Sequence, residues 1–166
     1  IQYAFRWQND DDASVAWTPQ GITGSADATA TGKVGTRSAV LVSFYDEPVA
    51  GSGEENRGVR IAFVDTTIPT APKYRFALLV LPKGTKDAPS FDPIRIHAGG
   101  IVWYGDRLYV ADTSRGFRVF DMRRILQVST ASTAFGCTGG TCSAGTYKYV
   151  IPQNGTYMVT SPCKPI

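Results

Sequence analysis

The apolar residues of this chain fall in short runs rich in β-branched and aromatic side chains, and glycine or proline separates most of these runs. Such runs are typical of strands, and no segment has the length and periodicity of a core helix. Residues 121–128 are expected to form a short connector. The chain is therefore predicted to be all-β. Seven strands are predicted, over residues 38–46, 58–65, 73–82, 101–105, 107–112, 116–122 and 147–153.

The composition is that of a globular chain with a packed core, because 43% of the residues are hydrophobic and 19% are charged. The net charge of +3 comes from lysines and arginines that are scattered among the acidic residues. No basic stripe for nucleic acid is therefore predicted. The longest apolar run, residues 76–82, is too short to span a membrane. Neither a nucleic acid nor a membrane is expected as a partner.

The predicted strands repeat in the same order along the chain. An Arg-Gly-x-Arg strand begins at Arg57 and again at Arg115, after a Gly-containing strand and an apolar strand, and a strand that ends in proline follows. Four antiparallel strands per repeat is the composition of a β-propeller blade. The first blade is predicted at residues 12–82 and the second at residues 94–152. Residues 153–166 would enter a third blade.

Four segments carry a resemblance to a known group of proteins: "WTPQGITGSADA", "LVSFYD", "HAGGIVWYGDRLYVADTSRGFRVFDMRRI" and "YKYVIPQNGTY". Together they resemble secreted β-propeller proteins of actinobacterial type, which are largely uncharacterised. The resemblance extends from Trp17 to Tyr157, and residues 97–125 are its most specific part. It implies a propeller fold and a secreted location, and it implies no particular reaction. Members of the group are longer than this chain, so further blades are implied.

The cysteines indicate an oxidising, extracellular compartment. Cys137 and Cys142 lie on either side of a Gly-Gly pair that lets the backbone turn tightly, so a local disulfide is predicted. It is expected to secure a surface loop between two strands of the second blade, with little contribution from the core. Cys163 has no partner in the chain. The chain also begins at Ile1 without a methionine, which suggests removal of a leader or pro-segment.

The predicted number of blades points to a missing partner. Propellers close with about four to eight blades, so two blades cannot form a ring. We expect proteolytic processing to have left the remaining blades on a second polypeptide, linked to this chain through Cys163. Assembly of several copies into a ring is another way to close the propeller. A compact two-sheet sandwich of about seven strands is the alternative fold.

His97, the only histidine, is the main candidate for a functional side chain. It is predicted on the innermost strand of its blade, where it would be either a packing residue or a group facing a central channel. A channel site would use Gln20, His97 and Trp103 to bind a ligand. A catalytic site would use His97 as acid or base, assisted by Asp27 or Asp112, although no Gly-x-Ser-x-Gly motif accompanies them.

No cofactor is predicted. A zinc site would need four ligands of the right type, and calcium on the propeller axis has no supporting motif. The acidic run at residues 9–14 is expected to be a solvated loop. Trp7, Trp17 and Trp103 are candidates for stacking on sugar rings, although the apolar strand around Trp103 favours a core position. The favoured function is a secreted binding or scaffold protein for a carbohydrate, a peptide or a surface. The alternative is a hydrolase or lyase that acts on a sugar or lactone.

Overall fold

A computed structural model of the protein describes residues 4–48, 50–52 and 55–158. It confirms the all-β prediction, because the described helices are the single turns α1 (Asn9–Asp12) and α2 (Ser25–Ala28). The seven predicted strands are all present. The described strands are β1 (Trp17–Gly24), β2 (Ala39–Asp46), β3 (Val59–Asp65), β4 (Lys73–Gly84), β5 (Pro89–Pro93), β6 (Ile101–Tyr104), β7 (Arg107–Asp112), β8 (Gly116–Asp121), β9 (Leu126–Gln127), β10 (Phe135–Thr138), β11 (Thr141–Ala144) and β12 (Tyr149–Tyr157).

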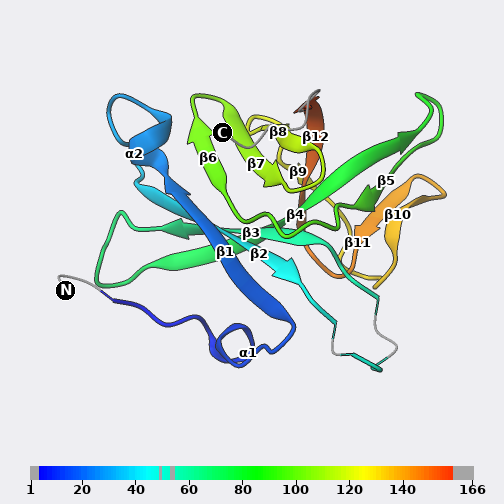
Figure 1. The fold of residues 1–166 in the computed structure, drawn as a ribbon, viewed down its shortest axis with the longest axis horizontal. Helices are drawn as coiled ribbons and strands as arrows, with labels where there is room; N and C mark the ends of the chain where they lie inside the picture. Colours follow the sequence, from blue (N-terminus) through cyan, green and yellow to red (C-terminus); the bar gives the residue numbers. More distant parts are fainter. Residues whose placement is uncertain (1–3, 49, 53–54, 159–166) are drawn as a thin grey trace, which may run out of the picture.

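Ten of these strands form one sheet with the path β1-β2-β3-β4-β12-β8-β7-β6, while β5 pairs with β4 and β9 pairs with β12 (Figure 1). The strand β12 joins two antiparallel units. Residues 150–152 pair in parallel with residues 78–80 of β4, and residues 153–157 pair antiparallel with β8. The long, two-part β12 therefore lets the sheet curl into a nearly closed, barrel-like form.

The two ends of the sheet path, β1 and β6, meet along a seam without ladder pairing. The backbone N–H of Trp103 donates to Thr23 Oγ1 at 3.1 Å. An added Cβ at Gly21 would lie only 3.0 Å from the backbone nitrogen of Ile101, so the glycine allows the close approach. On β2, Ser43 Oγ donates to the carbonyl oxygen of Ala98 at 2.9 Å. Side-chain hydroxyls therefore satisfy backbone groups where the sheet does not close.

Two apolar clusters pack against the opposite faces of the β2-β3-β4 region. The interior core lies between the two antiparallel units. The outer core lies on the other face, beneath the N-terminal segment and the hairpin β10–β11. The interior core contains Leu41, Val59, Ile61, Ala77, Leu79, Ile101, Trp103, Leu108, Val110, Phe120 and Ile151, and the outer core contains Trp17, Phe44, Ala62, Val64, Leu78, Val80, Phe91, Ala144 and Val150.

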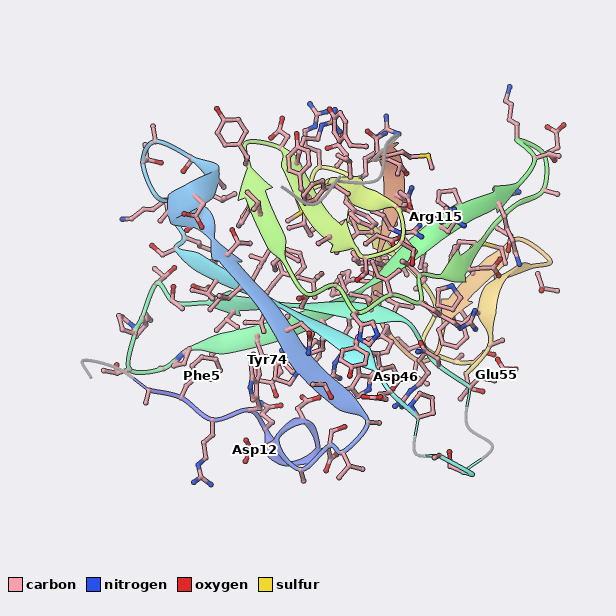
Figure 2. All side chains as sticks on the ribbon, viewed as in Figure 1. Phe5, Asp12, Asp46, Glu55, Tyr74 and Arg115 are labelled. Atoms are coloured by element: carbon pink, nitrogen blue, oxygen red, sulfur yellow. A yellow bond between two sulfur atoms is a disulfide. The ribbon has the colours of Figure 1, made fainter. Side chains whose placement is uncertain are left out.

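The N-terminal segment, residues 4–12, is fixed on the outer core by aromatic and polar contacts. The ring of Trp7 lies 5.0 Å from that of Tyr74 and 5.2 Å from that of Phe44, measured between centroids. Tyr74 Oη donates to Asp11 Oδ2 at 2.7 Å, and Figure 2 shows Tyr74 and Phe5 on the side of the sheet that this segment crosses. The acidic run was predicted to be a solvated loop. In the structure it includes the turn α1, and Asp11 is bound to the sheet.

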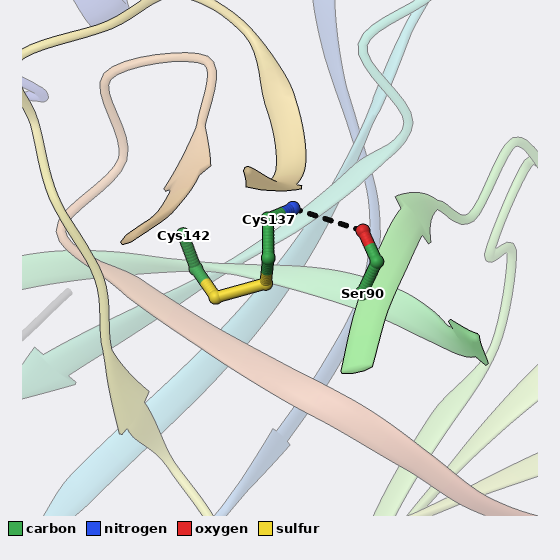
Figure 3. The surroundings of a disulfide bond; sticks show 3 residues. All are labelled: Ser90, Cys137 and Cys142. Atoms are coloured by element: carbon green, nitrogen blue, oxygen red, sulfur yellow. Dashed lines mark hydrogen bonds between the residues drawn. A yellow bond between two sulfur atoms is a disulfide. The ribbon is translucent and has the colours of Figure 1, made fainter. Parts of the chain in front are cut away.

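The predicted disulfide between Cys137 and Cys142 is present. The two cysteines are opposite each other in the hairpin β10–β11, which the sequence did not predict as strands. The backbone N–H of Cys137 donates to Ser90 Oγ at 2.9 Å (Figure 3). Both cysteines and Phe135 pack against the outer core, so the hairpin is part of the packed structure. The prediction that this loop contributes little to a core is wrong.

The propeller itself is not confirmed. Each antiparallel unit has four strands, β1-β2-β3-β4 in one and β6-β7-β8-β12 in the other. Propeller blades are separate sheets around a channel, whereas β12 hydrogen-bonds to both units and one interior core lies between them. The assignment of two blades within a larger ring stays a prediction, and Cys163 lies outside the described residues.

Candidate functional site

His97 and Gln20 lie near the same loop, between β5 and β6. His97 is exposed in this loop and not on a strand, and its ring centroid lies 4.7 Å from that of Tyr45. Gln20 is exposed on β1, and its Oε1 lies 3.9 Å from the position that a Cβ would take at Gly99. The loop therefore brings two of the predicted ligand-binding residues to one region of the surface.

The two aspartates predicted to assist His97 have structural partners of their own. Asp112 is buried, and its carboxylate accepts hydrogen bonds from Arg118 Nε at 2.8 Å and from the backbone N–H of Ser114 at 3.1 Å. Asp27 is exposed, and it accepts from Thr23 Oγ1 at 3.0 Å and from the backbone N–H of Gly24 at 3.2 Å. Asp112 therefore closes the β7–β8 turn, and Asp27 caps α2.

The tryptophans proposed for stacking on sugars lie mainly in the interior. Trp103 is 6% exposed within the interior core, and its indole N–H donates to the carbonyl oxygen of Gly105 at 2.9 Å. Trp17 is 7% exposed, and Trp7 is half-buried under the aromatic contacts described above. Trp17 is therefore buried and not exposed as predicted, whereas Trp7 is only partly exposed. Trp103 is a core residue, which leaves little of its ring for a ligand.

Exposed aromatic residues gather instead on the solvent-exposed face of β6, β7, β8 and β12, the side that faces away from the interior core. Alternation along each strand puts Val102, Tyr104, Tyr109, Phe117 and Tyr157 on this side, which we call the aromatic face. Val102 is opposite Tyr109, and Phe117 is opposite Tyr157. The exposed fraction is 71% for Tyr104, 63% for Tyr157 and 51% for Phe117. Apolar patches of this kind mark interaction sites.

A groove of about 350 Å³ crosses the aromatic face. Its floor includes Gly155, which has no side chain, at an irregularity in the pairing of β12 with β8. The rings of Tyr109 and Tyr157 are stacked, with centroids 6.2 Å apart and planes inclined by 30°. The lining residues are Arg107, Tyr109, Val119, Asn154, Gly155, Thr156 and Tyr157. The groove therefore combines two aromatic rings with several polar groups.

Arg107 and Asn154 are the principal polar groups of the groove. Arg107 Nη1 donates to Asn154 Oδ1 at 3.0 Å and pairs with Asp121 Oδ2 at 3.0 Å. Asp121 is 2% exposed, and the hydrogen bond from Arg123 is the main reason that its pKa lies well below the ordinary value. The ionised Asp121 therefore orients Arg107, while the amide nitrogen of Asn154 is a hydrogen-bond donor at the groove.

Sequence reasoning missed this site because the strands carry apolar residues on both faces. In "IVWY" and "GFRVFD" the pattern predicts strands and does not show which face is covered. One signal was available in the sequence. Residues 101 and 103 lie on one face of the predicted strand and residues 102 and 104 on the other, and all four have large side chains. Such a strand is either buried on both faces or leaves an apolar face exposed.

Metal and membrane sites receive no support within the described part of the chain. Among these residues there is no group of three or more His, Cys, Asp or Glu side chains that could hold a metal ion. None of the helices described here is long and apolar enough to cross a membrane.

Comparisons with protein families, with curated proteins and with solved structures find no match to this chain. The resemblance to secreted actinobacterial propellers therefore stays a prediction, and the function must be argued from the site itself.

Proposed function

We propose that the protein binds carbohydrate through the aromatic face. The observation that carries this proposal is the set of exposed aromatic rings around a groove that also holds Arg107 and Asn154. A sugar ring has apolar C–H faces and a rim of hydroxyl groups. The C–H faces pack on aromatic rings, and the hydroxyls need donors and acceptors within hydrogen-bond distance. The groove provides both kinds of contact side by side.

The size and rigidity of the groove fit a short segment of a glycan. Its volume of about 350 Å³ is at the lower end of the range for small-molecule sites, about 300–1,000 Å³. It lies on paired strands, which hold the side chains more rigidly than loops do. Tyr104 lies outside the groove on the same face, so a glycan longer than the groove would meet another aromatic ring.

The alternative function, a hydrolase or lyase centred on His97, gains no observation from the described residues. Asp112 accepts a hydrogen bond from Arg118 and Asp27 accepts one from Thr23, and among the described residues neither carboxylate has a hydrogen bond or ion pair with His97. The binding function is therefore the better supported proposal.

Three further parts of the proposal rest on the sequence alone. They are the secreted location, the larger propeller, and a second polypeptide linked through Cys163. The intact mass of purified material before and after reduction tests the last of these. A second mass that is released by reduction is expected. A single mass near 17.9 kDa under both conditions would contradict it.

Isothermal titration with cellohexaose, xylohexaose and chitohexaose tests carbohydrate binding directly. Tyr104→Ala and Tyr157→Ala should each weaken binding of the preferred oligosaccharide about tenfold, the effect of losing one aromatic contact that dominates a site. Ile68→Ala is the matched control, because Ile68 is 63% exposed on the β3–β4 connection, away from this face. The proposal fails if no oligosaccharide binds, or if the tyrosine variants bind as tightly as the control.

A further inference from the structure

A second concave site lies at one end of the nearly closed sheet. The residues after α2, the end of β3, the β6–β7 turn and the residues after β8 surround a cleft of about 560 Å³, which we call the mouth cleft. The backbone N–H of Gly105 donates to the carbonyl oxygen of Ala28 at 2.9 Å, and Figure 1 shows α2 beside β6. Ligand sites are common in the mouths of barrels. The lining residues are Thr29, Lys33, Val34, Gly35, Arg37, Ser38, Ala39, Phe63, Asp65, Trp103, Gly105, Asp106, Met122, Arg123 and Ile125.

The deep part of the mouth cleft is apolar. Ala39, Phe63 and Met122 pack against the interior core from this end, and Trp103 belongs to that core. A ligand here would replace water on these side chains with apolar contact. The floor is built on strands and a packed core, so it is formed before a ligand arrives.

The rim of the mouth cleft has an excess of positive charge. Arg37 is paired with Asp65, and Arg123 Nη1 lies 3.3 Å from Asp106 Oδ2. Lys33 has no ion pair with any residue that the structure describes. Three cations and two carboxylates therefore line the cleft, and one positive charge is left without a partner.

The loop that carries Lys33 is held in place by its own hydrogen bonds. The backbone N–H of Lys33 donates to Thr29 Oγ1 at 3.1 Å, and Thr29 Oγ1 donates to the carbonyl oxygen of Lys33 at 2.9 Å. Val34 and Arg37 exchange both of their backbone hydrogen bonds, at 2.9 and 3.1 Å. The backbone of Lys33 is therefore fixed at the edge of an apolar floor.

We propose that the mouth cleft binds a small amphipathic anion, an alkyl carboxylate with a medium-length chain. The apolar chain would lie on Ala39, Phe63 and Met122, above the buried Trp103, and the carboxylate would pair with Lys33 at the rim. This arrangement supplies the missing negative charge and leaves the ion pairs of Arg37 and Arg123 intact. The site is separate from the aromatic face, because Trp103 points to the interior side of β6 whereas Val102 and Tyr104 point outward.

Titration with decanoate, followed by amide NMR and calorimetry, tests the proposal. Decanol is the matched neutral probe. Decanoate should shift the indole N–H resonance of Trp103 and the amide resonances of Gly35 and Gly105, and it should bind more tightly than decanol. Lys33→Met should weaken decanoate binding about two- to fivefold, the effect of one exposed ion pair, without changing decanol binding. Lys86→Met, at an exposed lysine of the β4–β5 connection, should change neither.

Three results would overturn the proposal. The first is that decanol binds as tightly as decanoate. The second is that Lys33→Met and Lys86→Met have equal effects on decanoate binding. The third is that the shifted resonances lie outside the mouth cleft. Shifts confined to the apolar groove beside the disulfide, which includes Leu126 and Val128, would place the ligand there instead.

Discussion

Replacing Asp11 by asparagine tests whether the buried cation of Arg60 depends on its carboxylate partner. Arg60 Nη1 lies 3.0 Å from Asp11 Oδ1, and 5% of the Arg60 side chain is exposed. The guanidinium carbon lies 3.8 Å from the ring centroid of Phe76 and 4.4 Å from that of Trp17. Two of its nitrogens, Nε and Nη2, are buried without a hydrogen-bond partner among the described residues. Asp11→Asn keeps the shape of the partner and removes its charge.

The magnitude follows from the burial of each partner. Removing one member of a buried ion pair costs about 3–5 kcal/mol. Asp11 is 23% exposed, so water relieves part of this cost, and Asp11→Asn should cost about 3 kcal/mol. The separate variant Arg60→Met removes the buried cation itself. It loses a desolvated cation–π interaction of about 2 kcal/mol and gains sulfur–aromatic contacts of about 0.3–1.5 kcal/mol. Arg60→Met should therefore cost only about 1 kcal/mol.

Thermal and urea unfolding of the single and double variants measure this coupling. For a chain of this size, about 3 kcal/mol corresponds to a fall in Tm of roughly 6–12 °C. In the Arg60→Met background, Asp11→Asn should change stability by less than about 1 kcal/mol, because no buried cation remains. Asp12→Asn, at an exposed neighbouring position, is the control. Equal effects of Asp11→Asn in both backgrounds would refute the reasoning.

Two further predictions concern a glycine and a carboxylate. Gly136→Ala should cost about 1–3 kcal/mol, because Gly136 has a φ of +102° and an added Cβ would lie 2.7 Å from Ser90 Oγ. Gly139→Ala should lower the free energy of unfolding by less, because a Cβ at Gly139 meets no atom within 4 Å. Equal losses of unfolding free energy for the two variants in urea would contradict this. Asp121→Asn should destabilise the fold at neutral pH, because the hydrogen bond from Arg123 lowers the folded-state pKa of Asp121 well below its ordinary value. Its ionised form stabilises the fold above the unfolded-state pKa of about 3.9, and this stability is lost as the pH falls through the folded-state pKa. The melting temperatures of the wild-type protein and of Asp121→Asn should therefore converge in acid. A difference in Tm that stays constant as the pH falls would exclude a stabilising role for the ionised Asp121.

The seven predicted ranges match strands of the structure, including the four-residue β6, whereas β1, β5, β9, β10 and β11 are not among them. Strands such as β3 and β7 have consecutive β-branched and aromatic residues, and their bounds agree with the prediction within a few residues. Residues 89–93 begin and end with proline, which argues against a strand in sequence alone. They form β5 because pairing with the second half of β4 and contact with the hairpin β10–β11 outweigh that preference. The order β4-β12 joins segments about seventy residues apart, and no local pattern encodes such a parallel pair.

The candidate sites were harder to predict because they depend on which strand face is covered. Histidine and tryptophan are rare in this chain, and their rarity favoured His97 and Trp103 as candidate ligand-binding residues. The structure puts His97 on an exposed loop and Trp103 in the interior core. Tyrosines 104 and 157 drew no attention, because alternating apolar residues in a strand usually indicate burial. Their exposure follows from the sheet path, in which nothing among the described residues packs on that side of β6 and β12.

The seam between β1 and β6 determines which residues of "IVWY" face the interior. All four side chains are apolar, so hydrophobicity alone allows either register. The bond from the Trp103 N–H to Thr23 Oγ1 and the pairing of Trp103 with Leu108 fix one of them. A shift of one residue would bring Tyr104 inward and expose Trp103, because side chains alternate along a strand. Thr23 would then lose its backbone donor, and the aromatic face and the mouth cleft would both lose the residues that define them. The two proposed sites therefore depend on the same few hydrogen bonds at the seam.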